Sequence, residues 1–153
     1  MKNHLYNGLI AFFGGLFGVS VRFVILHLIT VNVGYLENVF PPTPLGRFLF
    51  ILIVIGFIEE GVKFLLIKRD VGQFPYGFLL GFGFGIGETV LKYPFWELGA
   101  VPVNRSGAII LHIITAGIIC YFVKKNRPVL GLVIAIAIHT GYDLFANWTI
   151  QLH

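Results

Sequence analysis

Ionisable side chains stand inside stretches of this sequence that are otherwise apolar. They are Arg22, His27, Glu59, Glu60, Lys63, Glu88, His112, His139 and Asp143. Glutamate and histidine carry out general acid–base chemistry, and two adjacent carboxylates can divide the roles of proton donor and base. One glutamate with two histidines is also a possible zinc set with a position open for water. The residue types therefore indicate a site that activates a water molecule.

The spacing places some of these side chains on shared helix faces. Glu59 and Lys63 are four residues apart, as are His139 and Asp143, and residues at i and i+4 lie on one face of a helix. Glu60 is turned from Glu59 by about 100°, at ~3.6 residues per turn. Each set also has a structural explanation, such as a snorkelling Lys63 at the membrane interface or a structural hydrogen bond between His139 and Asp143.

The composition excludes a soluble globular domain. Hydrophobic residues make up 57% of the 153 residues and charged residues only 12%, whereas soluble domains are about 45–50% apolar and about 25% charged. Cys120 is the single cysteine, so a disulfide scaffold is excluded as well. These values predict a small integral membrane protein.

Five apolar stretches predict an all-α bundle of about five transmembrane helices in one domain, residues 1–153. A helix of about 20 residues crosses the ~30 Å hydrocarbon core. The first stretch is longer than the ~7–15 apolar residues of a signal peptide and lacks a small-residue cleavage site, so we expect a retained helix. The stretches are Leu9–Ile29, Phe48–Ile67, Tyr76–Leu91, Ser106–Val123 and Val129–Ala146.

Basic residues in the loops predict the orientation, because cytoplasmic loops carry an excess of Lys and Arg. Five spans put the two termini on opposite sides. The amino-terminal side would hold Lys2, Lys68, Arg69, Lys124, Lys125 and Arg127, and the other side Arg47, Lys92 and Arg105. We therefore expect a multi-pass cell membrane protein with a cytoplasmic amino terminus and an external carboxyl terminus. The net charge of +4 is explained by these loops, and no patch suggests a nucleic acid partner.

Glycines recur at helical spacing in the third stretch. They form two ladders, Gly77/Gly81/Gly85 and Gly83/Gly87, and the first stretch has a pair at Gly14/Gly18. Small residues four apart let helix backbones approach closely in a membrane. We expect plain helix packing, with the further effect that neighbouring helices bring their side chains within reach of Glu88.

In their order on successive helices, these motifs resemble those of the PrsW-type intramembrane proteases. That family belongs to the wider superfamily of CAAX prenyl proteases and bacteriocin-processing enzymes. The matching motifs are Glu59-Glu60-x-x-Lys63, Phe84-x-x-x-Glu88, His112 and His139-x-x-x-Asp143. The resemblance covers roughly residues 48–146. It implies hydrolysis of a peptide bond in a membrane-anchored protein or peptide, inside or beside the lipid bilayer.

The resemblance also implies residue roles. Glu59, Glu60, His112 and His139 would be catalytic, with Lys63, Glu88 and Asp143 in support. The cofactor is either none or Zn²⁺, which Glu59, His112 and His139 would hold. We favour the metal-free scheme, because the double-Glu motif is shared with the prenyl proteases. Arg22 and His27 lie outside the resemblance, and we expect them to be nearly silent in catalysis.

Two other classes of function stay open at this point. Glu, His and Lys inside a membrane also mark the relays of ion and proton transporters, although internal repeats of the kind that transporters show are not found in the sequence. A catalytically inactive relative acting as a membrane scaffold is the second alternative. Loss of Glu59 or His139 would favour it, and both residues are present.

Overall fold

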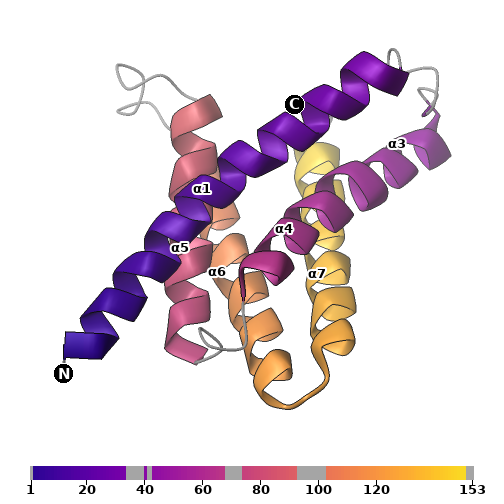
Figure 1. Ribbon diagram of the computed structural model, residues 1–153. Coiled ribbons are helices and arrows are strands. Elements are labelled where there is room, and N and C mark those ends of the chain that lie inside the picture. The colour runs from indigo at the N-terminus through magenta and orange to yellow at the C-terminus, as the bar shows by residue number, and fades with distance from the viewer. Residues whose placement is uncertain (1, 34–39, 41–42, 68–73, 93–102, 151–153) are drawn as a thin grey trace.

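The computed structural model describes residues 2–33, 40, 43–67, 74–92 and 103–150. Within these ranges every regular element is a helix, which confirms the predicted all-α class. In chain order the elements are α1 (Lys2–Val33), α3 (Pro44–Phe50), the π-helix η1 (Ile51–Phe57), α4 (Ile58–Leu66), α5 (Phe74–Lys92), α6 (Val103–Lys124) and α7 (Pro128–Ile150) (Figure 1).

Three of the described helical segments are long and apolar enough to cross a membrane. They are His4–Ile29, Ser106–Lys124 and Pro128–Ala146, and they correspond to the first, fourth and fifth predicted stretches. The second predicted stretch coincides with the run α3–η1–α4, and the third with α5. The described part of the chain is therefore membrane-embedded in character, with three spanning candidates by length and composition. Lys68, Arg69, Lys92 and Arg105, on which the predicted orientation partly depends, lie outside the residues whose side chains are described.

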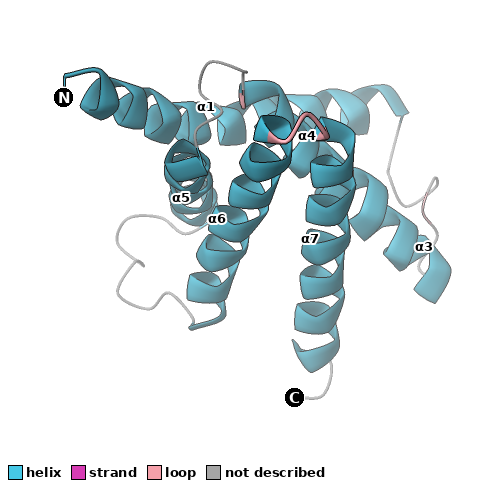
Figure 2. Ribbon diagram, turned by 90° about the horizontal axis from the view of Figure 1, so that it is seen from below, coloured by secondary structure: helices cyan, strands magenta, loops and turns pink. Residues whose placement is uncertain are grey.

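The helices pack in a closed order around α4. Helix α5 contacts α1 on one side and α6 on the other, and α6 contacts α7. The run α3–η1–α4 completes the circuit, because η1 packs on α7 while α4 packs on α1 and also reaches α6 and α7 (Figures 1 and 2). The short helix with the two glutamates is thus enclosed by α1, α6 and α7.

The run that carries the glutamates changes its winding just before they occur. Thr43 caps α3, since its Oγ1 accepts a hydrogen bond from the Gly46 amide at 3.1 Å. The next seven residues, Ile51–Phe57, are wound as a π-helix, and α4 follows without a break. Single π turns inside α-helices occur frequently at functional sites. Here the π turns end directly ahead of Glu59 and Glu60.

The two glycine ladders of α5 face two different helices. A Cβ at Gly77, Gly81 or Gly85 would collide with α6, and one at Gly81 would meet the backbone of His112. A Cβ at Gly83 would collide with the backbone of Phe12 on α1, and Gly87 also faces α1. The close approach predicted for these glycines is therefore present on both sides of α5.

The glycine pair predicted for α1 is only half correct. Gly18 lies against Leu66 and Phe84, but nothing stands within 4 Å of a Cβ built at Gly14. The close contact is made instead by Gly15, where a Cβ would collide with the backbone carbonyl of Leu80 on α5. The reason is the rotation of α1 about its axis, which aims positions 15 and 18 at the bundle and position 14 away from it.

Candidate functional site

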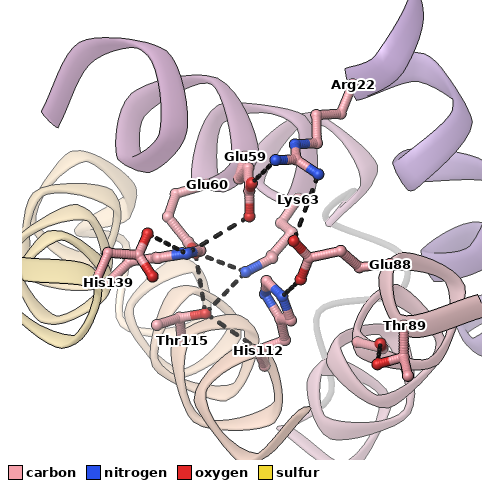
Figure 3. A network of polar contacts seen from close by, with 11 residues as sticks. Arg22, Glu59, Glu60, Lys63, Glu88, Thr89, His112, Thr115 and His139 are labelled. Atoms are coloured by element: carbon pink, nitrogen blue, oxygen red, sulfur yellow. Dashed lines mark hydrogen bonds and ion pairs between the residues drawn. The ribbon is translucent and has the colours of Figure 1, made fainter. Parts of the chain in front are cut away.

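Eight ionisable or hydroxyl side chains from five helices converge in the interior of the bundle (Figure 3). None of them exposes more than 6% of its surface. Burying charges at membrane depth costs several kcal/mol unless they are paired, so such a cluster requires a reason. The eight are Arg22 on α1, Glu59, Glu60 and Lys63 on α4, Glu88 on α5, His112 and Thr115 on α6, and His139 on α7.

Glu60 is the centre of the first half of the site, which we call the Glu60 cluster: Glu60, Lys63, Thr115 and His139. Glu60 Oε1 accepts from Lys63 Nζ at 2.6 Å, from Thr115 Oγ1 at 3.1 Å and from His139 Nδ1 at 2.5 Å. Lys63 Nζ also donates to Thr115 Oγ1 at 3.0 Å. The Glu60 carboxylate thus ties α4 to both α6 and α7, and its charge is matched by the Lys63 ammonium.

Arg22 organises the second half, which we call the Glu59 cluster: Arg22, Glu59, Glu88 and His112. Arg22 Nη2 lies 2.5 Å from Glu59 Oε1, and Arg22 Nη1 lies 3.5 Å from Glu88 Oε1. Glu88 Oε2 is 2.7 Å from His112 Nε2. The guanidinium of α1 therefore bridges a carboxylate of α4 and a carboxylate of α5.

The Glu59 cluster differs from the Glu60 cluster in how many polar atoms lack hydrogen bonds. Among the described residues, both carboxylate oxygens of Glu59 are buried without a hydrogen-bond partner, and so are Arg22 Nε, Arg22 Nη1 and His112 Nδ1, whereas in the Glu60 cluster the one such atom is Glu60 Oε2. The 2.5 Å contact between Arg22 and Glu59 is an ion pair that does not have the directions of a hydrogen bond. These atoms retain unused capacity to bind a further molecule.

The two clusters meet at the imidazoles. His139 Nε2 lies 3.5 Å from Glu59 Oε2, and the rings of His112 and His139 stand edge to face with centroids 5.3 Å apart. Asp143 lies one turn further along α7, where its Oδ2 is 3.5 Å from His139 Nε2 and its side chain is 21% exposed. Glu59 thus faces two imidazole rings across a short distance.

The arrangement suits a metal ion, although no ion is part of this structure. Glu59, His112 and His139 each offer one ligand atom, and these atoms lie within 4.8 Å of one another. Each imidazole is also anchored through a ring nitrogen by a carboxylate, Glu60 for His139 and Glu88 for His112. Carboxylate-anchored histidines are typical of metal ligands. One carboxylate and two imidazoles with an open position fit zinc, and they are the three residues that the sequence suggests.

The structure brings all seven sequence-derived candidates to one place. One pairing differs from the expected one: Lys63 was expected on the face of Glu59, but its ammonium lies on Glu60, at i and i+3. Asp143 stands at the edge of the group, whereas the others lie within it.

Arg22 lies outside the motifs of the resemblance but inside the site. Its guanidinium contacts Glu59 and Glu88, a placement that the motifs do not predict. The signal was present in the sequence, since an arginine within the first apolar stretch is costly and by default functional. His27, on the same helix, is exposed and is not one of the eight residues of the site.

Comparison with known proteins returns nothing: no family model, no curated protein and no solved structure matches the chain. What the site can do is therefore inferred from its own residues.

Proposed function

We propose that this protein is an intramembrane protease, in which Glu59 activates the water that hydrolyses a peptide bond of a membrane-anchored substrate. One observation carries the proposal. Glu59 is 1% exposed, and within the described residues neither of its oxygens has a hydrogen-bond partner, while it faces two imidazoles that are each anchored by another carboxylate. A carboxylate with free lone pairs in a buried polar cluster is suited to act as a general base.

The chemical steps follow from the positions of these groups. A water molecule held among Glu59, His112 and His139 gives a proton to Glu59 as its oxygen bonds to the carbonyl carbon of the substrate. The electron pair of the C=O bond moves to the carbonyl oxygen. When the C=O bond reforms, the C–N bond breaks, and the departing amine takes the proton from Glu59.

The carboxylates behind the imidazoles have a positioning role in this scheme. Glu60 accepts from His139 Nδ1 and Glu88 lies on His112 Nε2, so each ring is fixed with its second nitrogen available to the water. Lys63 and Thr115 hold Glu60 in turn. A site held in this way needs little rearrangement when the reaction begins, which is a main source of catalytic power in enzymes.

Zinc is compatible with this site but is not required by the scheme. Glu59, His112 and His139 would hold the ion, which would supply Lewis acid chemistry to the water and the carbonyl group. Glu59 already has a cationic partner in Arg22 at 2.5 Å, so positive charge is available without a metal. We therefore favour the metal-free form, in line with the resemblance to PrsW-type and prenyl proteases.

For the membrane, we propose a five-span bundle in which the run α3–η1–α4 and helix α5 cross together with the three apolar helices. The amino end of α1 and the turn between α6 and α7 lie toward the same end of the bundle (Figure 1). That turn contains Lys124, Lys125 and Arg127, which favours the cytoplasm for this end. A reporter inserted in the turn should be cytoplasmic and one fused after His153 external. Reporting from a single compartment would contradict the five-span arrangement.

The deciding experiment incubates the purified protein with a panel of single-span substrates and compares wild type with Glu59→Ala. We expect cleavage by wild type and by the control His27→Gln, whose side chain is exposed on α1, and none by Glu59→Ala. Equal cleavage by Glu59→Ala would overturn the mechanism. A protein that cleaves nothing but moves protons across liposomes in a Glu88-dependent way would be a transporter, and one that does neither would be a scaffold.

A further inference from the structure

Arg22 lies close enough to Glu59 to take part in the reaction as well as to stabilise the fold. Its guanidinium is 6% exposed and lies 2.5 Å from the oxygen of the base, Glu59. In the described part of the chain, its Nε and Nη1 have no hydrogen-bond partner. A guanidinium has five N–H donors in a planar fork, so several of them remain to bind another molecule.

We infer that Arg22 is a catalytic residue that donates hydrogen bonds to the carbonyl oxygen of the substrate as negative charge develops there. The inference rests on the proposed protease function. In the step described above, the electron pair of the C=O bond moves to the carbonyl oxygen while the proton of the water goes to Glu59. A cation beside Glu59 lies where that oxyanion forms, and buried donors at such a position stabilise it far more than they would in water.

The fold holds Arg22 at this place through the contacts of α1. Gly15 and Gly18, which lie on α1 within two turns before Arg22, let α1 come against the backbone of α5 and against Leu66 of α4. Val19, one turn before Arg22, is fully buried in the same contact. The close packing leaves the guanidinium little freedom to move away from Glu59. Preorganised donors of this kind are not reoriented during the reaction.

A purely structural role for Arg22 makes a different prediction. In that case the guanidinium would only neutralise the two carboxylates that it touches, Glu59 and Glu88. Any single positive charge would then do, and removing the arginine together with one of the carboxylate charges would restore the balance. A hydrogen-bond donor to the oxyanion cannot be replaced in either way, because the planar fork of arginine is not reproduced by lysine.

The test uses the full-length protein and a cleaved single-span substrate. It compares Arg22→Lys with wild type, and the double variant Arg22→Gln/Glu88→Gln with Glu88→Gln alone. Glutamine at position 88 keeps an oxygen toward His112 and removes the negative charge. We expect both comparisons to show kcat lowered by about 10²–10³-fold, the usual effect of losing one oxyanion donor, with KM changed little. His27→Gln is the matched control on the same helix.

A second readout is binding of a peptide phosphinate, whose tetrahedral anion imitates the intermediate. We expect both Arg22 variants to lose affinity for the phosphinate by a similar factor, while affinity for the uncleaved peptide stays near that of their reference proteins. This comparison holds even where a variant turns over too slowly to be measured, and thermal unfolding in detergent shows that the double variant is folded.

The remaining outcomes distinguish the protease function from the catalytic role of Arg22. Wild-type protein that cleaves no peptide overturns the protease function and this inference with it. Active wild type with near-normal kcat in Arg22→Lys, or in the double variant relative to Glu88→Gln, overturns the inference alone and leaves Arg22 as a charge partner. Equal loss of affinity for the phosphinate and for the peptide would also assign it a structural role.

Discussion

The Glu60 cluster and the Glu59 cluster each combine glutamate, histidine and a basic residue, but they differ in how many of their polar atoms are hydrogen-bonded. Three donors converge on one oxygen of Glu60, and the adjacent cation, Lys63, has two hydrogen-bond acceptors. In the Glu59 cluster Arg22 makes ion pairs with Glu59 and Glu88, and Glu88 is hydrogen-bonded to His112. Among the described residues, five buried atoms of this cluster have no hydrogen-bond partner, against one, Glu60 Oε2, in the Glu60 cluster. A buried polar atom without a partner costs roughly 1–3 kcal/mol.

The difference indicates which cluster holds the helices together and which cluster is available for the reaction. A buried hydrogen-bond network makes the arrangement of its helices rigid. The Glu60 cluster, in which only Glu60 Oε2 lacks a partner among the described residues, joins α4, α6 and α7 in this way. Unsatisfied groups persist at functional sites, where a substrate or water completes them. The Glu59 cluster, which joins α1, α4, α5 and α6, has this character.

The largest effect on stability is expected when the Glu60 cluster is broken. Lys63→Ala removes the cation beside Glu60 and leaves that carboxylate buried with only Thr115 and His139, so unfolding should become easier by about 3–5 kcal/mol. The measurement is thermal or denaturant unfolding in detergent, with Lys125→Ala in the exposed α6–α7 turn as a control. Stability equal to that of the control would show that the Glu60 cluster does not hold the helices together.

The two neighbouring glutamates should respond oppositely to the same isosteric change. Glu59→Gln removes the basic oxygens, so cleavage should fall by at least ~10²-fold. Its stability should fall less than that of Glu60→Gln, because Arg22 keeps Glu88 as an ion-pair partner. Glu60→Gln should lower stability more, since three donors lose their carboxylate acceptor. Rates on a fixed substrate and unfolding in detergent measure the two effects. If Glu59→Gln unfolds while Glu60→Gln stays folded, the Glu59 cluster and not the Glu60 cluster holds the helices together.

A smaller effect separates two adjacent glycines of α1. Gly15→Ala would force a Cβ into the backbone of Leu80, whereas Gly14→Ala meets nothing within 4 Å. We expect Gly15→Ala to destabilise by about 1–3 kcal/mol, as overpacked sites do, and to reduce activity through the displaced Arg22. Gly14→Ala should be neutral or stabilising by up to about 1 kcal/mol. Identical behaviour of the two variants would mean that α1 is rotated differently from the arrangement described above.

The smallest effect is expected from a chelator. If Arg22 supplies the positive charge beside Glu59, active protein should contain no stoichiometric zinc, and chelation should leave its cleavage rate unchanged. Elemental analysis of active protein and the rate before and after chelation test this. The opposite result would be stoichiometric zinc whose removal abolishes activity and whose return restores it. In that case Glu59, His112 and His139 bind the metal together, and the contrast between the two clusters disappears.

The local features of the site were readable from single residues. The apolar runs predicted membrane helices, because so apolar a chain cannot cover the surface of a soluble domain. Glu59, Glu60, His112 and His139 interrupt these runs, which predicted polar groups inside the membrane. Residue chemistry indicated that one glutamate with two histidines could hold zinc, and the resemblance selected Glu59, His112 and His139 from the carboxylates and imidazoles inside the spans. The glycines of α5 likewise predicted that neighbouring helices pack closely against α5, but their spacing does not identify those neighbours.

What the sequence by itself determined is therefore the class of protein, the helices and the residue types at the site. Only the tertiary structure decided that Arg22 reaches Glu59, that Lys63 lies on Glu60 and that Gly15, not Gly14, meets α5. The physical reason is that these contacts depend on the rotation and offset of whole helices. Those are set by many weak contacts between segments far apart in the chain, and no local spacing encodes them.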